Sequence, residues 1–179
     1  MDPLDIIKDY YRPGTLAFER LVRHGEQVAG KALATAARVA HLDPDVTFIQ
    51  EAAMLHDIGM FMTDSPGIGC SGTHPYVMHG VLGRRLLDRR GLHRHGRVCE
   101  RHIGVGISAE DVRRERLPLP VRDMMPETLE EEIICFADKF FSKNNGRPKE
   151  KPVARILQSL RYYGDDKCDR FTSWLEKFG

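Results

Sequence analysis

The chain has 179 residues, of which 41% are hydrophobic and 30% are charged, and its formal net charge is +1. These values are typical of one globular domain with a full core. The balanced charge excludes a bulk electrostatic attraction to nucleic acid or to a membrane surface, so we expect neither as a partner. No apolar run approaches the roughly 20 residues that span a bilayer, and the N-terminus does not resemble a signal peptide, so we expect a cytoplasmic protein.

The residue pattern predicts an all-α fold. Apolar residues recur at three- and four-residue intervals along most segments, which is the period of one helix face. Asp43 and Pro44 have the residue types preferred at the cap and at the first position of a helix, and Gly59 has the type that ends one. We find no strand alternation and no internal repeat. The expected helices cover residues 4–11, 16–40, 44–57, 75–90, 93–102, 128–141, 153–163 and 167–177.

Glycine and proline mark residues 60–73 and 104–126 as two long loops. Neither loop has the composition of a linker between domains. We therefore expect a single domain over residues 1–179. Within it, a motif-bearing core covers about residues 16–145, and C-terminal helices cover about residues 150–178.

An adjacent histidine and aspartate, His56 and Asp57, end the apolar run that begins at Ala52. Polar side chains without partners are costly in such a buried stretch. A divalent metal would be a partner for both. One nitrogen and one oxygen ligand suit zinc, iron, manganese, cobalt or nickel better than calcium.

Four further residues of ligand type lie on other predicted helices or at their ends: His24, His79, His102 and Asp138. Taken singly, each histidine has an ordinary interpretation as a hydrogen-bonded core residue, and Asp138 has one as the partner of a nearby lysine or arginine. Together they match the way in which helix bundles build metal sites, from inward side chains of facing helices. We expect the other four histidines to be solvated, because they lie near loops or helix ends: His41, His74, His93 and His95. Of these, His74 could instead belong to the site, because it lies close to His79 in the sequence.

The order of these residues resembles the HD superfamily of metal-dependent phosphohydrolases. Residues 56–59 are the HDIG tetrapeptide of that family as it stands, and His24 falls where the family has its first histidine. Asp138, between Ala137 and Lys139, falls where the family closes its site. The resemblance implies a helical HD domain in which four residues hold a first metal: His24, His56, Asp57 and Asp138.

Family members with two metals add two histidines between the HD pair and the last aspartate. Here His79 and His102 are in those positions, and Asp57 would then bridge both ions. The related cyclic-di-nucleotide phosphodiesterases carry a GYP signature and a His-His-Glu run, which this chain lacks. The chain therefore resembles a compact stand-alone HDIG protein.

The resemblance implies a hydrolase with one or two divalent ions, the metal being iron, manganese, cobalt, nickel, zinc or magnesium. We expect it to act on a small phosphorylated molecule, such as a nucleotide or another small phosphate ester. The sequence does not decide whether the protein is a monomer or a homo-oligomer. The catalytic residues would be Asp57, His79, His102 and Lys139; either histidine could instead donate a proton to the leaving oxygen in a one-metal version. Lys139 could neutralise a phosphate oxygen, or it could be a solvated helix lysine. The alternatives are a di-iron oxygenase of the HD fold and a non-catalytic sensor that binds a nucleotide through its metal.

Overall fold

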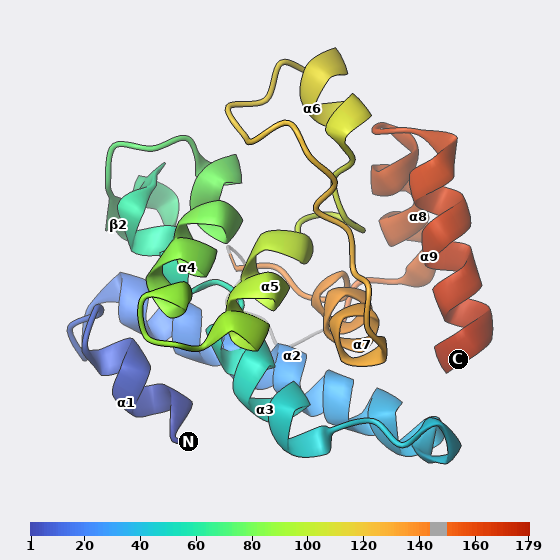
Figure 1. The fold of residues 1–179 in the computed structure, drawn as a ribbon, viewed down its shortest axis with the longest axis horizontal. Helices are drawn as coiled ribbons and strands as arrows, with labels where there is room; N and C mark the ends of the chain where they lie inside the picture. The colour runs from blue at the N-terminus through green and yellow to red at the C-terminus, as the bar shows by residue number, and fades with distance from the viewer. Residues whose placement is uncertain (144–149) are drawn as a thin grey trace.

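The computed structural model describes residues 1–143 and 150–179, and the regular secondary structure of this part of the chain is helical apart from one small β-hairpin (Figure 1). The all-α prediction is confirmed. None of the described helices is long and apolar enough to cross a membrane. The helices are α1 (Pro3–Lys8), α2 (Leu16–Arg38), α3 (Val46–Leu55), α4 (His79–Asp88), α5 (His93–Arg101), α6 (Ala109–Arg114), α7 (Leu129–Asp138), α8 (Val153–Arg161) and α9 (Asp165–Phe178).

The long helix α2 forms the base on which α3 and α7 pack, and α4 and α5 form a pair that lies against α3 (Figure 1). The buried stripe of α2 includes Leu21, Val28 and Ala32, at helical spacing. His24 lies in the same stripe and is therefore directed into the core. The helical spacing that buries the apolar residues of α2 thus also buries His24, a residue that can bind a metal.

Helix α3 begins at Val46, two residues later than the sequence predicts. Its N-cap is Asp45, whose carboxylate accepts a hydrogen bond from the Phe48 N–H at 3.0 Å. Asp43 instead ends a short 3-10 turn in the left-handed conformation, with φ of 53°. The prediction of Asp43 and Pro44 as cap and first position is wrong because tertiary contacts hold Asp45: its N–H donates to Glu130, and Arg94 pairs with its carboxylate.

Helix α3 ends at Leu55, and a 3-10 turn covers Ile58–Met62. The prediction that Gly59 ends the helix is therefore wrong. Gly59 lies in the 3-10 turn that follows the helix. A Cβ atom on Gly59 would lie 2.2 Å from the His79 carbonyl oxygen and 2.5 Å from the Gly83 nitrogen. The glycine of the tetrapeptide lets the 3-10 turn contact the backbone of α4, so that the segments carrying Asp57 and His79 lie side by side.

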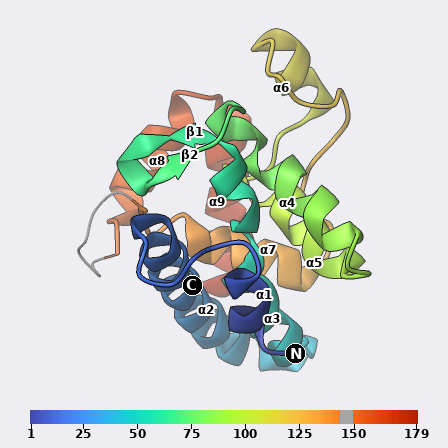
Figure 2. The same cartoon turned by 90° about the vertical axis from the view of Figure 1, so that its left-hand side faces the viewer.

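The two predicted loops contain short regular elements. In the first, β1 (Asp64–Ser65) pairs antiparallel with β2 (Cys70–Ser71). The turn of this hairpin lies against the start of α2, where Gly69 approaches Ala17 (Figure 2). The second loop contains α6, which begins with a capping box between Ser108 and Asp111.

The C-terminal helices α8 and α9 pack on the rest of the bundle. Phe171 of α9 stacks on Phe136 of α7, with ring centroids 5.5 Å apart, and Phe178 lies 5.4 Å from the same ring. Ile156 of α8 belongs to the same buried apolar cluster. The core boundary expected near residue 145 lies outside the described residues.

Candidate metal centre

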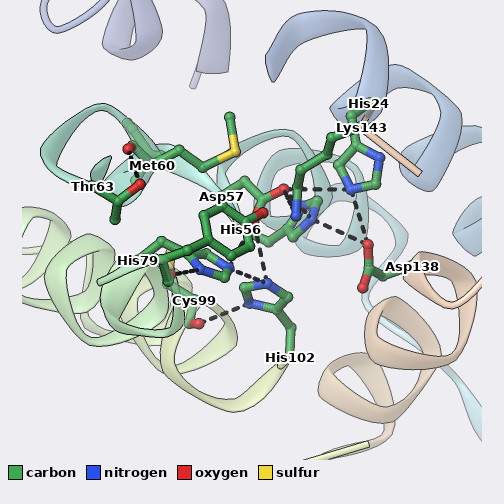
Figure 3. A network of polar contacts seen from close by, with 12 residues as sticks. His24, His56, Asp57, Met60, Thr63, His79, Cys99, His102, Asp138 and Lys143 are labelled. Carbon is green, nitrogen blue, oxygen red and sulfur yellow. Dashed lines mark hydrogen bonds and ion pairs between the residues drawn. The ribbon is translucent and has the colours of Figure 1, made fainter. Parts of the chain in front are cut away.

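The structure brings all six predicted ligand residues together in the middle of the bundle (Figure 3). Each is buried, with at most 8% of its surface exposed. Helix α2 carries His24, and α7 carries Asp138 as its last residue. The others lie at helix ends: His56 and Asp57 directly follow α3, His79 begins α4, and His102 follows α5.

A first set of ligand-type atoms surrounds one carboxylate oxygen of Asp57, Oδ2. The Nε2 atoms of His24 and His56 lie 3.4 Å and 3.1 Å from this oxygen. Asp138 closes the set, with its Oδ1 atom 2.9 Å from His24 Nε2 and 3.6 Å from His56 Nε2. Two nitrogens and two oxygens from residues up to 114 positions apart are thus directed at a common point.

A second set faces the other carboxylate oxygen of Asp57. Its Oδ1 atom lies 3.1 Å from His79 Nε2 and 3.3 Å from His102 Nε2, and the two nitrogens are 3.2 Å apart. Each oxygen of one carboxylate therefore belongs to a different set of histidines. This is the arrangement that an aspartate bridging two ions requires.

Backbone carbonyls determine which nitrogen of three of these rings carries the proton. His56, His79 and His102 each approach, with Nδ1, the carbonyl oxygen of the residue three positions earlier, at 2.6, 2.6 and 2.8 Å. A carbonyl can only accept, so each Nδ1 must donate. In a neutral ring the Nε2 atom then has a lone pair aimed at Asp57, which is how second-shell hydrogen bonds orient metal-binding histidines.

The chemistry of these donors fits a divalent ion. In their neutral form, with Nδ1 donating to a carbonyl, the rings of His79 and His102 turn two lone pairs toward each other and toward a carboxylate oxygen. Among the described residues, His56 Nε2 and Asp57 Oδ1 are buried without a hydrogen-bond partner, and Asp57 Oδ2 pairs with the Lys143 ammonium at 2.8 Å. Buried polar atoms of this kind are costly unless a cation satisfies them. Imidazole nitrogen and carboxylate oxygen suit zinc and the other first-row divalent metals.

Comparison with known proteins agrees with this geometry. The HD domain family matches residues 6–142, which include all six of these residues. The chain belongs to the HD domain family. No solved structure matches it at a significant level.

Several curated proteins are similar to this HD domain chain. It is 34% identical over 128 residues to a tRNA (cytidine(56)-2′-O)-methyltransferase of Picrophilus torridus, covering 70% of this chain and 33% of that protein. A Thermoplasma volcanium protein of the same name is 31% identical over 164 residues, covering 90% of this chain and 42% of the relative. An uncharacterised protein of Methanocaldococcus jannaschii is 36% identical over 126 residues, covering 69% of this chain and 67% of that protein. The chain thus spans less than half the length of the two methyltransferases.

Burial and charge act in opposite directions on the histidines of this HD domain. Burial alone lowers the pKa of a histidine, but the neighbouring Asp57 and Asp138 carboxylates outweigh it and raise the pKa of His56 to about 10. Burial dominates at His102 and lowers its pKa to about 4, and it also lowers the pKa of His24. In the metal-free protein His56 is therefore the cationic histidine, while His24 and His102 are neutral.

Both carboxylates stay ionised although they are buried. Burial raises the pKa of Asp57, but His56 and Lys143 outweigh it and hold that pKa well below its usual range. Burial likewise raises the pKa of Asp138, and Lys139 together with His24 outweighs it. The centre thus keeps two negative charges available for a cation.

Lysines complete the electrostatics of the centre. Lys139, predicted as a catalytic residue, lies with its Nζ atom 3.3 Å from Asp138 Oδ2. Lys143, which the sequence analysis missed, places its Nζ atom 2.8 Å from Asp57 Oδ2 and 5.5 Å from the centroid of the Tyr76 ring. The sequence offered no helical signal for Lys143, because α7 ends at Asp138.

Tyr76, which the sequence analysis did not identify as part of the site, packs on the second set of histidines. Its ring stacks on that of His79 with centroids 4.6 Å apart, and its carbonyl accepts the His79 Nδ1 hydrogen bond. Burial raises the pKa of the Tyr76 hydroxyl to about 12, so this hydroxyl stays protonated. Tyr76 therefore fixes the His79 ring both by contact and by hydrogen bonding.

One histidine prediction is wrong. His95, expected to be solvated, is 8% exposed and lies outside the centre. Its Nε2 atom is 3.3 Å from Glu51 Oε2, and its ring lies edge-on to Phe48 at 4.9 Å. Packing of α5 on α3 buries it, which helix periodicity in α5 alone does not reveal.

A pocket of about 420 Å³ opens onto the first set of ligand-type atoms. His24 and Asp138 lie in its wall, and so does Tyr76. Three lysines also line it: Lys139, Lys143 and Lys151. The pocket therefore offers a concentration of positive charge beside two buried carboxylates.

Proposed function

We propose that this HD domain protein is a metal-dependent phosphohydrolase that acts on a nucleotide or another small phosphate ester. The observation that carries the proposal is the Asp57 carboxylate, whose two oxygens face two different pairs of histidines at 3.1–3.4 Å. Two adjacent cation sites suit the hydrolysis of a phosphate ester because such a reaction develops charge on several oxygens at once. The lysine-lined pocket suits the same substrate, since phosphate is anionic.

In the reaction, the oxygen of a water molecule forms a bond to phosphorus, and the bond from phosphorus to the ester oxygen breaks. The products are phosphate and an alcohol, whose oxygen takes up a proton. A divalent ion bound at the centre supplies a Lewis acid that lowers the pKa of water toward neutrality. Six residues would hold one or two such ions: His24, His56, Asp57, His79, His102 and Asp138.

The remaining groups bind and orient the ester. Lys139, Lys143 and Lys151 are within one pocket wall and would bind the nonbridging phosphate oxygens. Because Nδ1 of His79 and of His102 donates to a backbone carbonyl, Nε2 carries no proton in the neutral form of either ring. This favours their role as ligands over the role of proton donors, and the alcohol takes its proton from a lysine or from solvent.

The test is phosphate release by the purified protein, with its metal content measured by elemental analysis. We expect release from 5′-mononucleotides or 4-nitrophenyl phosphate under nitrogen, and its loss in Asp57→Asn. Asp43→Asn is the matched control, because Asp43 is exposed and has a left-handed conformation that asparagine also adopts. An iron-loaded protein that is active only with oxygen would instead support the oxygenase. Tight nucleotide binding without turnover would support the sensor.

The relatives favour a second candidate, in which the ester belongs to RNA. Two of them carry the name of a tRNA methyltransferase, although this chain spans only 33% and 42% of their lengths. In the same assay, RNA oligonucleotides with a terminal phosphate should then release it faster than mononucleotides do. Equal or slower release would leave the small ester as the substrate.

A further inference from the structure

A second and larger cavity adjoins the metal centre. Its volume is about 640 Å³, inside the range of roughly 300–1,000 Å³ that is usual for sites of small organic ligands. It shares two wall residues, Lys139 and Lys151, with the pocket over the first set of ligand-type atoms. The two spaces are therefore adjacent, with these lysines in the wall of both.

The cavity also touches the side of the centre where the second set of histidines lies. Ile103, the residue after His102, lines it, and so does Val77, two residues before His79. Helix α8 forms part of another wall with Ile156 and contributes polar groups as well. The lining of the cavity as a whole is mainly apolar, so it suits an organic group better than a second phosphate.

The charges of the cavity are unevenly distributed. Asp111 in its wall is buried and paired with both Lys167 and Arg114, so that its charge is compensated inside the protein. Lys151, in the wall shared with the smaller pocket, donates to the Lys139 carbonyl at 3.1 Å, and its ammonium has no carboxylate among its recorded partners in the described residues. A phosphate ester would thus be oriented with its phosphate at the shared lysines and its organic group in the apolar space.

We propose that this cavity binds the organic group of the phosphate ester and selects groups of nucleoside size over small polar ones. The inference rests on the proposed function and deepens it. The hydrolysis would leave the alcohol product in this cavity and the phosphate at the lysines. Burial of a ring on the apolar wall would then contribute to KM, while the chemical step remains at the metal centre.

The test blocks the cavity without altering the metal centre. Ser159 lines the cavity from an exposed position on α8, so Ser159→Trp places a large ring at its mouth without changing the core. The matched control is Ser173→Trp, at an exposed position of the neighbouring α9 that does not line the cavity. Two alkyl esters, adenosine 5′-monophosphate and glycerol 3-phosphate, are compared because their leaving oxygens are chemically alike.

We expect Ser159→Trp to raise KM for adenosine 5′-monophosphate about tenfold or more, and to leave kcat/KM for glycerol 3-phosphate unchanged. Ser173→Trp should change neither value. Adenosine alone should bind the metal-free protein in equilibrium dialysis, and Ser159→Trp should weaken that binding. Equal effects on both esters, no effect on either, or no adenosine binding would overturn the inference.

The same experiment separates this inference from the proposed function. If no ester is hydrolysed with any divalent metal, the phosphohydrolase is wrong, while adenosine binding still reports on the cavity. If both esters are hydrolysed equally well by the wild type, the phosphohydrolase stands and selection by the cavity is wrong.

Discussion

The Nζ atom of Lys143 lies 2.8 Å from Asp57 Oδ2, the same carboxylate oxygen that faces His24 and His56. The ammonium is thus beside the oxygen that the first ion would use. A metal ion and this ammonium compete for one carboxylate, because each compensates the same buried negative charge. In the proposed phosphohydrolase, Lys143 would therefore link the affinity for metal to the affinity for an anionic substrate.

Replacing Lys143 by methionine should separate these two roles. Without the ammonium, the first ion should bind about tenfold more tightly, since it no longer displaces a paired cation. Turnover of a phosphate ester should fall, because a group that binds phosphate is lost. Metal titration and steady-state kinetics measure the two effects. Lys177→Met, which removes an exposed lysine paired with Glu132, is the control, and an equal change in both proteins would contradict the role of Lys143.

Asp57→Ala should abolish metal retention and activity while the helical circular dichroism spectrum persists. Asp57 belongs to both candidate ligand sets, so its loss removes an oxygen from each. Elemental analysis after gel filtration measures the metal. Unchanged metal content in a folded variant would count against the site.

His79→Ala and His102→Ala should each lower the metal stoichiometry from about two toward one. Both Nε2 atoms belong to the second set, around Asp57 Oδ1. The same elemental analysis gives the ratio of metal to protein. If neither substitution changes it, the interpretation with two ions is wrong.

Metal binding at pH 7 should release about one proton per first ion, and His56 should be its source. Its pKa of about 10 in the metal-free protein means that it is protonated at this pH, and a metal ligand must be neutral. His102, with a pKa of about 4, has no proton to release. The apparent affinity should therefore rise about tenfold per pH unit between pH 7 and 9. Calorimetry in buffers of different ionisation enthalpy measures the proton, and its persistence in His56→Gln would exclude this source.

Gly59→Ala should destabilise the fold by about 1–3 kcal/mol because the new methyl group would overlap the backbone of α4. Gly30→Ala offers the opposite control. Gly30 is exposed in the middle of α2 with no atom near its would-be Cβ, so alanine there should stabilise by about 0.5–1 kcal/mol. Urea unfolding of both variants gives the free energies. Equal stability of the two variants would show that the close approach at Gly59 is not tight.

Several features were not predictable from local patterns. Asp43 and Asp45 are both acceptable helix caps, and only contacts with Glu130 and Arg94 decide in favour of Asp45. His95 has a polar neighbourhood in the sequence, yet the packing of α5 on α3 buries it. Lys143 lies beyond the end of α7, where no helix period relates it to Asp57.

The amino-acid sequence by itself determined the helical class, the HD family and the residue types that can hold a metal. These properties are local, because helix periodicity and ligand chemistry are readable over a few neighbouring residues. Only the tertiary structure decided that the two oxygens of Asp57 face different histidine pairs, that Lys143 contacts one of them, and that an apolar cavity adjoins the centre. Such relationships depend on distances between residues up to 114 positions apart, which the packing of helices sets.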